Sequence, residues 1–153
     1  MKISYYITHF PYDNVVDGYK YGGAEYVAYN LALKAAEKHD VNVFTTSANS
    51  KDLIEERNGM RIHRYGTKFR IECGNISPKL FSKPLEYDAD IVHAHFSTPP
   101  AELAALRYAK KKNVPFVLTY HGDWQENFGS FIRRVTLSCY NRYLLDKVCL
   151  VQM

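Results

Sequence analysis

The stretch Tyr21-Gly22-Gly23-Ala24-Glu25 joins an apolar, strand-like run at residues 3–7 to the first helical pattern of the chain. Glycine has no Cβ, so the backbone can turn sharply here and can come close to a ligand. The first amides of a helix have no partner within it and lie at the positive end of its dipole, which suits a phosphate or another anion. We interpret Gly22 and Gly23 as one wall of an anion site. A plain flexible turn is the alternative, because neither G-x-G-x-x-G nor the P-loop pattern is present.

Strand-like and helix-like segments alternate along the sequence. Runs rich in β-branched residues predict strands, and apolar residues three or four apart predict helices. The strands are predicted at residues 2–8, 41–45, 59–65, 90–95, 114–120 and 147–151, and the helices at residues 23–38, 100–113 and 131–145. Residues 59–65 alternate in polarity and are expected to form a more exposed strand near the sheet edge, whereas residues 46–58 and 68–83 give no clear pattern. The alternation predicts an α/β fold of three layers with a mainly parallel sheet.

Several polar side chains follow the predicted strands. Right-handed crossovers bring the strand-to-helix loops to one edge of a parallel sheet, where ligands of such sheets bind. Three loops are predicted to meet there: Gly22-Gly23, His95 to Pro99, and His121 to Asp123. His93 and His95 share a face of their strand, and we expect His93 to be packed and His95 to be exposed at the edge. No metal site is expected, because further ligands for this histidine pair are lacking.

Two carboxylates and a group of aromatic residues lie near the proposed crevice. Asp123 and Glu25 are candidates for a general base, although a carboxylate in the first turn also stabilises a helix electrostatically. The aromatic side chains of the first loop either stack on a sugar or lipid or form a packed loop core. They are Phe10, Tyr12, Tyr19 and Tyr21.

Composition narrows the class of protein. The chain has 153 residues, a net charge of +4 and three cysteines without a C-x-x-C motif, which predicts one folded domain in a reducing compartment. No run approaches the ~18 apolar residues of a transmembrane helix, so a cytoplasmic location is expected.

The cationic excess lies in residues 101–153. We interpret the lysines at 110–112 as a helix end and expect no nucleic-acid partner, while the basic, amphipathic residues 131–145 predict either a solvated face or peripheral contact with anionic membrane.

Three motifs together resemble the amino-terminal domain of GT-B glycosyltransferases, specifically the large retaining family 4. They are Tyr21-Gly22-Gly23-Ala24-Glu25, Asp90-Ile91-Val92-His93-Ala94-His95 and Thr119-Tyr120-His121-Gly122-Asp123. The order and spacing of the motifs carry the resemblance, which covers essentially the whole chain. It implies a Rossmann-like, acceptor-binding domain at residues 1–153 that faces a second domain holding a nucleotide-sugar donor. It also implies transfer with retention to a glycan, lipid or small-molecule acceptor, without a metal or a cofactor.

The resemblance also implies roles for individual residues. Gly22 and Gly23 would approach the donor diphosphate, and His121 would be the catalytic residue beside the transferred sugar. Contacts to the acceptor or sugar are assigned to Tyr21, Glu25, His95, Ser97 and Asp123. The donor-binding domain of the family has no counterpart in this sequence, so we expect half of a longer enzyme that does not transfer sugar alone.

Other classes stay open at this point. A non-catalytic phosphate- or nucleotide-binding module of the flavodoxin-like type has the same alternation of strands and helices. An interaction scaffold is a further alternative. A dehydrogenase domain is disfavoured, because G-x-G-x-x-G is missing at the first turn.

Overall fold

Seven strands form one sheet in the computed structural model, which describes residues 1–71, 74–97, 100–121 and 149–152. The strands are β1 (Lys2–Tyr6), β2 (Asp40–Thr46), β3 (Leu53–Arg57), β4 (Met60–Tyr65), β7 (Ile91–Phe96), β8 (Phe116–Tyr120) and β9 (Cys149–Gln152). Their order is β3-β4-β2-β1-β7-β8-β9. Every neighbouring pair is parallel except β3 and β4. The predicted α/β fold with a mainly parallel sheet is therefore confirmed.

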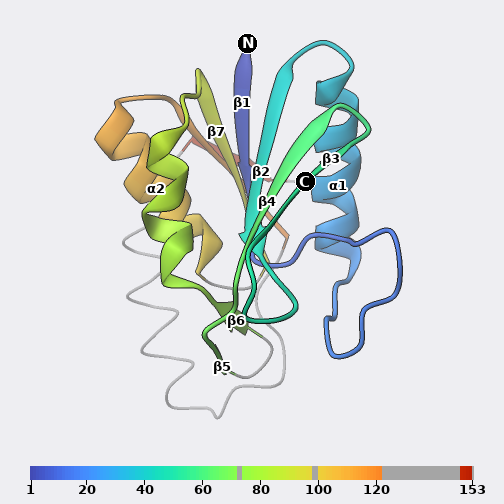
Figure 1. Cartoon of the computed structure of the whole chain (residues 1–153). Coiled ribbons are helices and arrows are strands. Elements are labelled where there is room, and N and C mark those ends of the chain that lie inside the picture. The colour runs from blue at the N-terminus through green and yellow to red at the C-terminus, as the bar shows by residue number, and fades with distance from the viewer. Residues whose placement is uncertain (72–73, 98–99, 122–148, 153) are drawn as a thin grey trace.

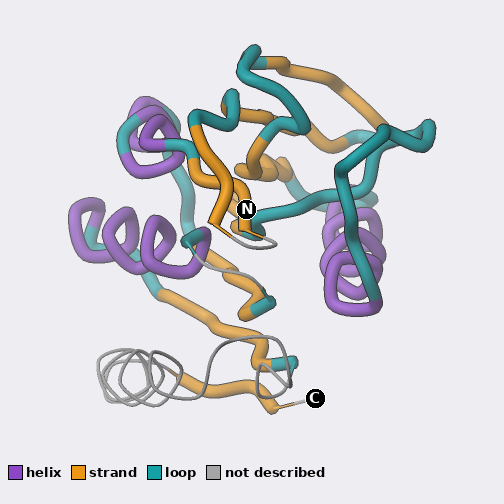
Figure 2. The backbone as a smooth tube through the Cα atoms, turned by 90° about the horizontal axis from the view of Figure 1, so that it is seen from below, coloured by secondary structure: helices purple, strands orange, loops and turns teal. Residues whose placement is uncertain are grey.

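The sheet lies between helices α1 (Gly23–Ala36) and α2 (Ala101–Lys112), which cover opposite faces (Figures 1 and 2). The pleat explains why each strand serves both layers, because successive side chains point to opposite faces. Tyr5 and Ile7 of the first strand segment pack with Ala28 of α1, whereas Tyr6 between them packs with Tyr108 of α2. We refer to these two sides of the sheet as the α1 face and the α2 face.

The carboxyl ends of the parallel strands lie at one edge of the sheet. Figure 1 shows this edge at the bottom, where the loop after β1 turns back into the first residues of α1. The pairing of Phe96 with Tyr120 puts the ends of β7 and β8 side by side. The predicted meeting of the glycine turn with the loops after β7 and β8 is confirmed as far as Ser97 and His121. Asp123 and Gly122 lie outside the described residues.

The prediction of an exposed strand near the sheet edge at residues 59–65 was wrong in its exposure. Only Arg61 of β4 is exposed, because β3 covers that side and is itself the edge strand. A two-residue turn joins the pair, and both of its residues have positive φ, 51° at Asn58 and 78° at Gly59. Asn-Gly favours this kind of hairpin turn. The dipeptide is therefore the signal by which β3 could have been predicted.

Residues 68–83, which show no clear pattern in the sequence, fold into short elements at the carboxyl edge. A small antiparallel hairpin consists of β5 (Phe69–Ile71) and β6 (Gly74–Ile76). Two single 3₁₀ turns follow, η1 (Pro78–Phe81) and η2 (Lys83–Glu86), and they pack on the α2 face. The predicted helix at residues 131–145 lies outside the described residues. No helix that the structure describes is long and apolar enough to cross a membrane.

Candidate functional site

The glycine turn opens α1 at the carboxyl edge. Gly22 is the N-cap with φ −131° and ψ −152°, so its backbone is extended. Its N–H donates to Oε2 of Glu25 at 2.7 Å, and its carbonyl accepts from the amide of Tyr26 at 3.2 Å. A Cβ at Gly23 would meet no atom within 4 Å. The fold itself therefore does not require glycine at residue 23, and the space where its Cβ would lie is open.

Three histidines form a stack on the α1 face, which we call the histidine stack: His93, His95 and His121. The rings of His93 and His95 lie 4.5 Å apart between centroids and those of His95 and His121 lie 5.3 Å apart, with interplanar angles of 25° and 18°. Nδ1 of His95 is 3.0 Å from Nε2 of His121. Nε2 of His93 is 2.7 Å from the hydroxyl of Thr119. The predicted shared face of His93 and His95 is confirmed.

His93 is packed, as expected, because its ring lies 5.1 Å from that of Tyr5 and 4.5 Å from that of His95. The expected exposure of His95 was wrong, because His95 is fully buried. The cause is the position of β7, which lies inside the sheet between β1 and β8. The chain after β8 then brings the His121 ring over His95. The carboxyl end of β7 is thus covered by the chain that follows β8.

Burial keeps this stack in the neutral form. Burial and the neighbouring His93 and His121 lower the pKa of His95 to about 2. Burial, with a smaller effect of His121, lowers the pKa of His93 to about 4. Burial also lowers the pKa of His121, while the negative charge of Glu25 acts in the opposite direction. All three imidazoles are therefore uncharged at neutral pH.

Glu25 connects the helix start to these histidines. Its carboxylate is buried and accepts the N–H of Gly22, which supports the helix-stabilising interpretation of this residue. Its charge also acts on His9, where it opposes the lowering of the pKa by burial. His9 is a residue that sequence reasoning missed, because a single histidine after a strand gives no specific signal. Glu25 therefore places a negative charge within reach of two imidazoles.

The other assigned contacts lie around the same edge. Ser97 follows β7 directly and is partly buried. The ring of Tyr21 is partly buried and meets the rings of Tyr19 and Tyr26 edge-on, at 6.3 and 5.6 Å. Asp123 lies outside the described residues, as does the basic segment 131–145, so membrane contact through that segment stays a prediction.

The aromatic residues of the first loop form a packed core. Phe10 and Tyr19 are buried. The hydroxyl of Tyr19 donates to the carbonyl of Thr46 at 2.9 Å and accepts from the amide of Phe10 at 3.0 Å. For these two residues the packed-core alternative is confirmed. The loop is thereby joined to the end of β2.

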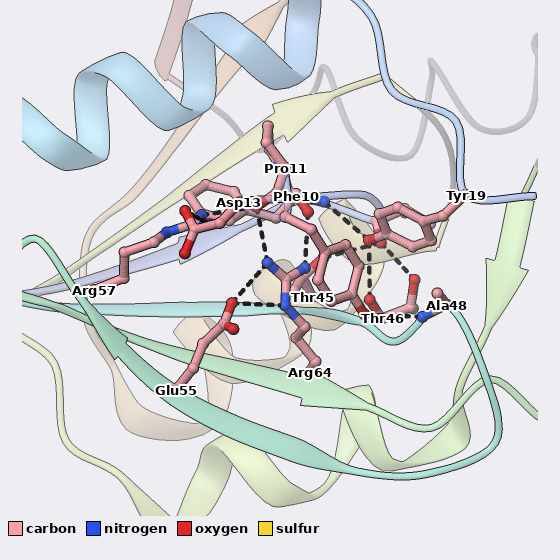
Figure 3. Close-up of polar contacts among 12 residues, drawn as sticks. Phe10, Pro11, Asp13, Tyr19, Thr45, Thr46, Ala48, Glu55, Arg57 and Arg64 are labelled. Carbon is pink, nitrogen blue, oxygen red and sulfur yellow. Dashed lines mark hydrogen bonds and ion pairs between the residues drawn. The ribbon is translucent and has the colours of Figure 1, made fainter. Parts of the chain in front are cut away.

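Two arginines that sequence reasoning missed hold this loop, and we call them the arginine clamp: Arg57 and Arg64 (Figure 3). Arg64 is fully buried and donates to the carbonyls of Phe10 and Pro11 at 2.7 and 2.8 Å. Its Nε donates to Glu55 at 2.8 Å, and its guanidinium lies 3.6 Å from the ring centroid of Tyr12. Arg57 donates to the carbonyl of Pro11 and pairs with Asp13, each at 2.7 Å.

The clamp fixes the route of the chain into the glycine turn. Loop carbonyls buried against the sheet need donors, and a guanidinium supplies several in a fixed fork. The sequence pattern of an alternating strand predicts that an arginine in it is exposed to solvent. Its hydrogen-bond partners could therefore be found only from the fold. No group of three or more His, Cys, Asp or Glu side chains in the described part of the chain could hold a metal ion.

The sequence matches the family model of Glycosyltransferase Family 4 over residues 21–150. The match begins at the glycine turn and includes all three motifs of the carboxyl edge. No curated protein matches the sequence.

Proposed function

Because the chain belongs to Glycosyltransferase Family 4, we propose that it is the acceptor-binding domain of a retaining glycosyltransferase with a nucleotide-sugar donor. The acceptor is a glycan, a lipid or a small molecule. A second domain holds the nucleotide of the donor, and neither a metal ion nor a cofactor takes part. A glycosyltransferase-type function is supported by the family itself, and the finer assignments are supported by the geometry of the carboxyl edge.

The observation that carries the proposal is the open space at Gly23. Gly23 has no Cβ, and the space where one would lie holds no protein atom within 4 Å, so a ligand can come close to the backbone at the start of α1. The N–H of Gly22 is taken by Glu25, so the amides after it are the ones that can bind the donor diphosphate. Amides fixed at a helix start stabilise the charge that develops on a leaving diphosphate without moving during the reaction.

His121 is the proposed catalytic residue. It follows β8 at the same edge and is only partly buried, so a ligand can reach its ring. Its lowered pKa makes it a neutral imidazole, which can donate a hydrogen bond to a sugar hydroxyl at neutral pH. Tyr21, Glu25, His95, Ser97 and Asp123 are proposed to shape the acceptor and sugar site around it.

A Gly23→Ala substitution tests the diphosphate site. The added methyl meets no protein atom, so the fold is expected to persist, but it occupies the approach to the helix start. We expect inorganic pyrophosphate to shift the amide NMR signals of residues 23 and 24 in the wild type. Loss of one or two hydrogen bonds to a charged group should weaken binding roughly tenfold or more in the variant. Asn30→Ala, on the exposed side of the same helix, is the matched control.

Equal pyrophosphate binding by Gly23→Ala and the control would contradict the diphosphate site. Tight binding of a nucleotide without a sugar by chain 1–153 would favour the flavodoxin-like module, because the proposed function leaves the nucleotide to the second domain. Chain 1–153 alone is expected to bind diphosphate without transferring sugar, and turnover by this chain would contradict the division of labour with a second domain.

A further inference from the structure

The histidine stack contains a fully buried imidazole, His95, that the ligand does not need to reach. We propose that His95 is a positioning residue for His121: it donates from Nδ1 to Nε2 of His121, so that the His121 ring carries its proton on Nδ1 and presents it to the crevice. The proposal rests on the proposed role of His121 and specifies the form in which that residue acts.

The geometry fixes His95 before any ligand binds. Its ring lies between two others in the stack and also faces Tyr5, whose centroid is 6.2 Å away at an interplanar angle of 27°. His93 below it is tethered to Thr119 of β8. His95 is fully buried, so its ring cannot turn without displacing the rings that pack against it. The nitrogen that reaches His121 is therefore held by the packing of the stack.

The direction of the proton follows from the other nitrogen of His95. Its Nε2 is buried and has no hydrogen-bond partner among the described residues. If His95 accepted from His121, its own proton would sit on Nε2 as a buried N–H without a partner. Buried donors without a partner are rare in folded proteins, because the loss of their hydrogen bonds to water is not compensated. A proton on Nδ1 of His95 leaves only an unshared lone pair at Nε2, so His95 is the donor.

This direction determines what His121 can do. Its Nε2 is occupied as an acceptor, and a neutral imidazole has one N–H, so the proton of His121 lies on Nδ1. The charged group that acts on this ring is Glu25 from α1, and the titratable groups of the stack on β7, His93 and His95, are neutral. A hydrogen bond accepted by Nε2 disfavours protonation there, in the same direction as the burial that lowers the pKa of His121. His121 is thus set as a neutral donor rather than a base.

Long-range ¹H–¹⁵N NMR of the imidazole rings in the 153-residue chain tests the proposal. In the wild type at pH 7.5, we expect His121 to show the pattern of a ring protonated on Nδ1. In His95→Phe, which keeps an aromatic ring in the stack but removes the donor, we expect mixed tautomers and a raised pKa of His121. The matched control is His63→Asn, because His63 is also buried in the sheet but bonds to Asn42. The control should leave His121 unchanged.

An Nε2-protonated His121 in the wild type would overturn the proposal, and that measurement does not depend on a variant that folds. Identical His121 signals in the wild type and in a folded His95→Phe would overturn it as well. Pyrophosphate binding by the wild type separates this proposal from the proposed function, because the tautomer of His121 is measured without a ligand. A wild type with the expected tautomer but no pyrophosphate binding would count against the diphosphate site and not against the His95 contact.

Discussion

The arginine clamp and the histidine stack are two buried polar networks on the α1 face, and they differ in charge. Arg64 carries a permanent positive charge and pairs with Glu55 and two loop carbonyls. The histidine stack is neutral and holds its members through ring stacking and single hydrogen bonds. The clamp joins β3 and β4 to the first loop, whereas the stack consists of two residues of β7 and the residue that follows β8.

This difference in charge suits two different roles: the clamp holds a loop, and the stack presents a reactive group. A guanidinium stays charged at any pH at which the protein is folded, so a loop fixed by it does not respond to protons. An imidazole in a buried site can be kept neutral and still donate a hydrogen bond. The clamp therefore defines the path into the glycine turn, and the stack defines the chemical state of His121.

The largest expected effect comes from breaking the clamp. Arg64→Met removes a buried cation and leaves Glu55 and two loop carbonyls without their donor. Breaking one side of a buried ion pair should lower the free energy of unfolding by about 3–5 kcal/mol. Urea denaturation followed by circular dichroism measures it. Arg61→Met is the matched control, because Arg61 on the same strand makes an exposed pair with Glu56, and its loss should cost at most about 1 kcal/mol. Equal losses in both variants would show that the clamp does not hold the loop.

Acidification should act on the imidazoles and spare the clamp. The folded state holds His95 with a pKa of about 2, and His93 and His63 with pKa values of about 4. An unfolded histidine titrates near 6.5. Because these folded pKa values are depressed, the unfolded chain binds more protons, so stability is complete above about pH 6.5 and falls as the pH drops toward the folded pKa values. Each such histidine contributes a slope of up to about 1.4 kcal/mol per pH unit in that window.

Unfolding free energies at a series of pH values between 7.5 and 5 check this expectation. Arg64→Met should show the same slope as the wild type, since its charge does not titrate. In His95→Phe, the slope of the unfolding free energy against pH should be smaller by about the contribution of one histidine. A flat profile in the wild type would mean that the stack is already charged or accessible to water.

The sequence predicted the parts of this comparison that depend on apolar patterns. Strand β7 and helix α2 were predicted within a residue or two, because a buried run and a basic helix end are local signals. The meeting of the glycine turn with His121 followed from the handedness of βαβ units. These features need no knowledge of which side chains touch.

The missed features depend on contacts between distant segments. Arg64 reads as a solvated residue of an alternating strand, and only the loop that crosses it makes it a buried donor. His95 was expected to be exposed because its own strand ends there, but His121, the residue after the neighbouring strand, covers it. Edge strand β3 has little apolar pattern because both of its faces are partly open to solvent. Burial at a sheet edge is decided by the neighbouring segment and not by the strand itself.

The smallest expected effect on stability, and the sharpest on the site, comes from Glu25→Gln. The amide oxygen can still accept the N–H of Gly22, so the free energy of unfolding should change by no more than about 1 kcal/mol. The lost negative charge no longer raises the pKa of His121, so that pKa should fall further, and pyrophosphate should bind more tightly because a like charge is gone. NMR titration of the imidazole signals and of pyrophosphate measures both. Glu37→Gln, exposed at the other end of α1, is the control and should change neither quantity. An unchanged pKa of His121 in Glu25→Gln would mean that the start of α1 and the histidine stack act independently.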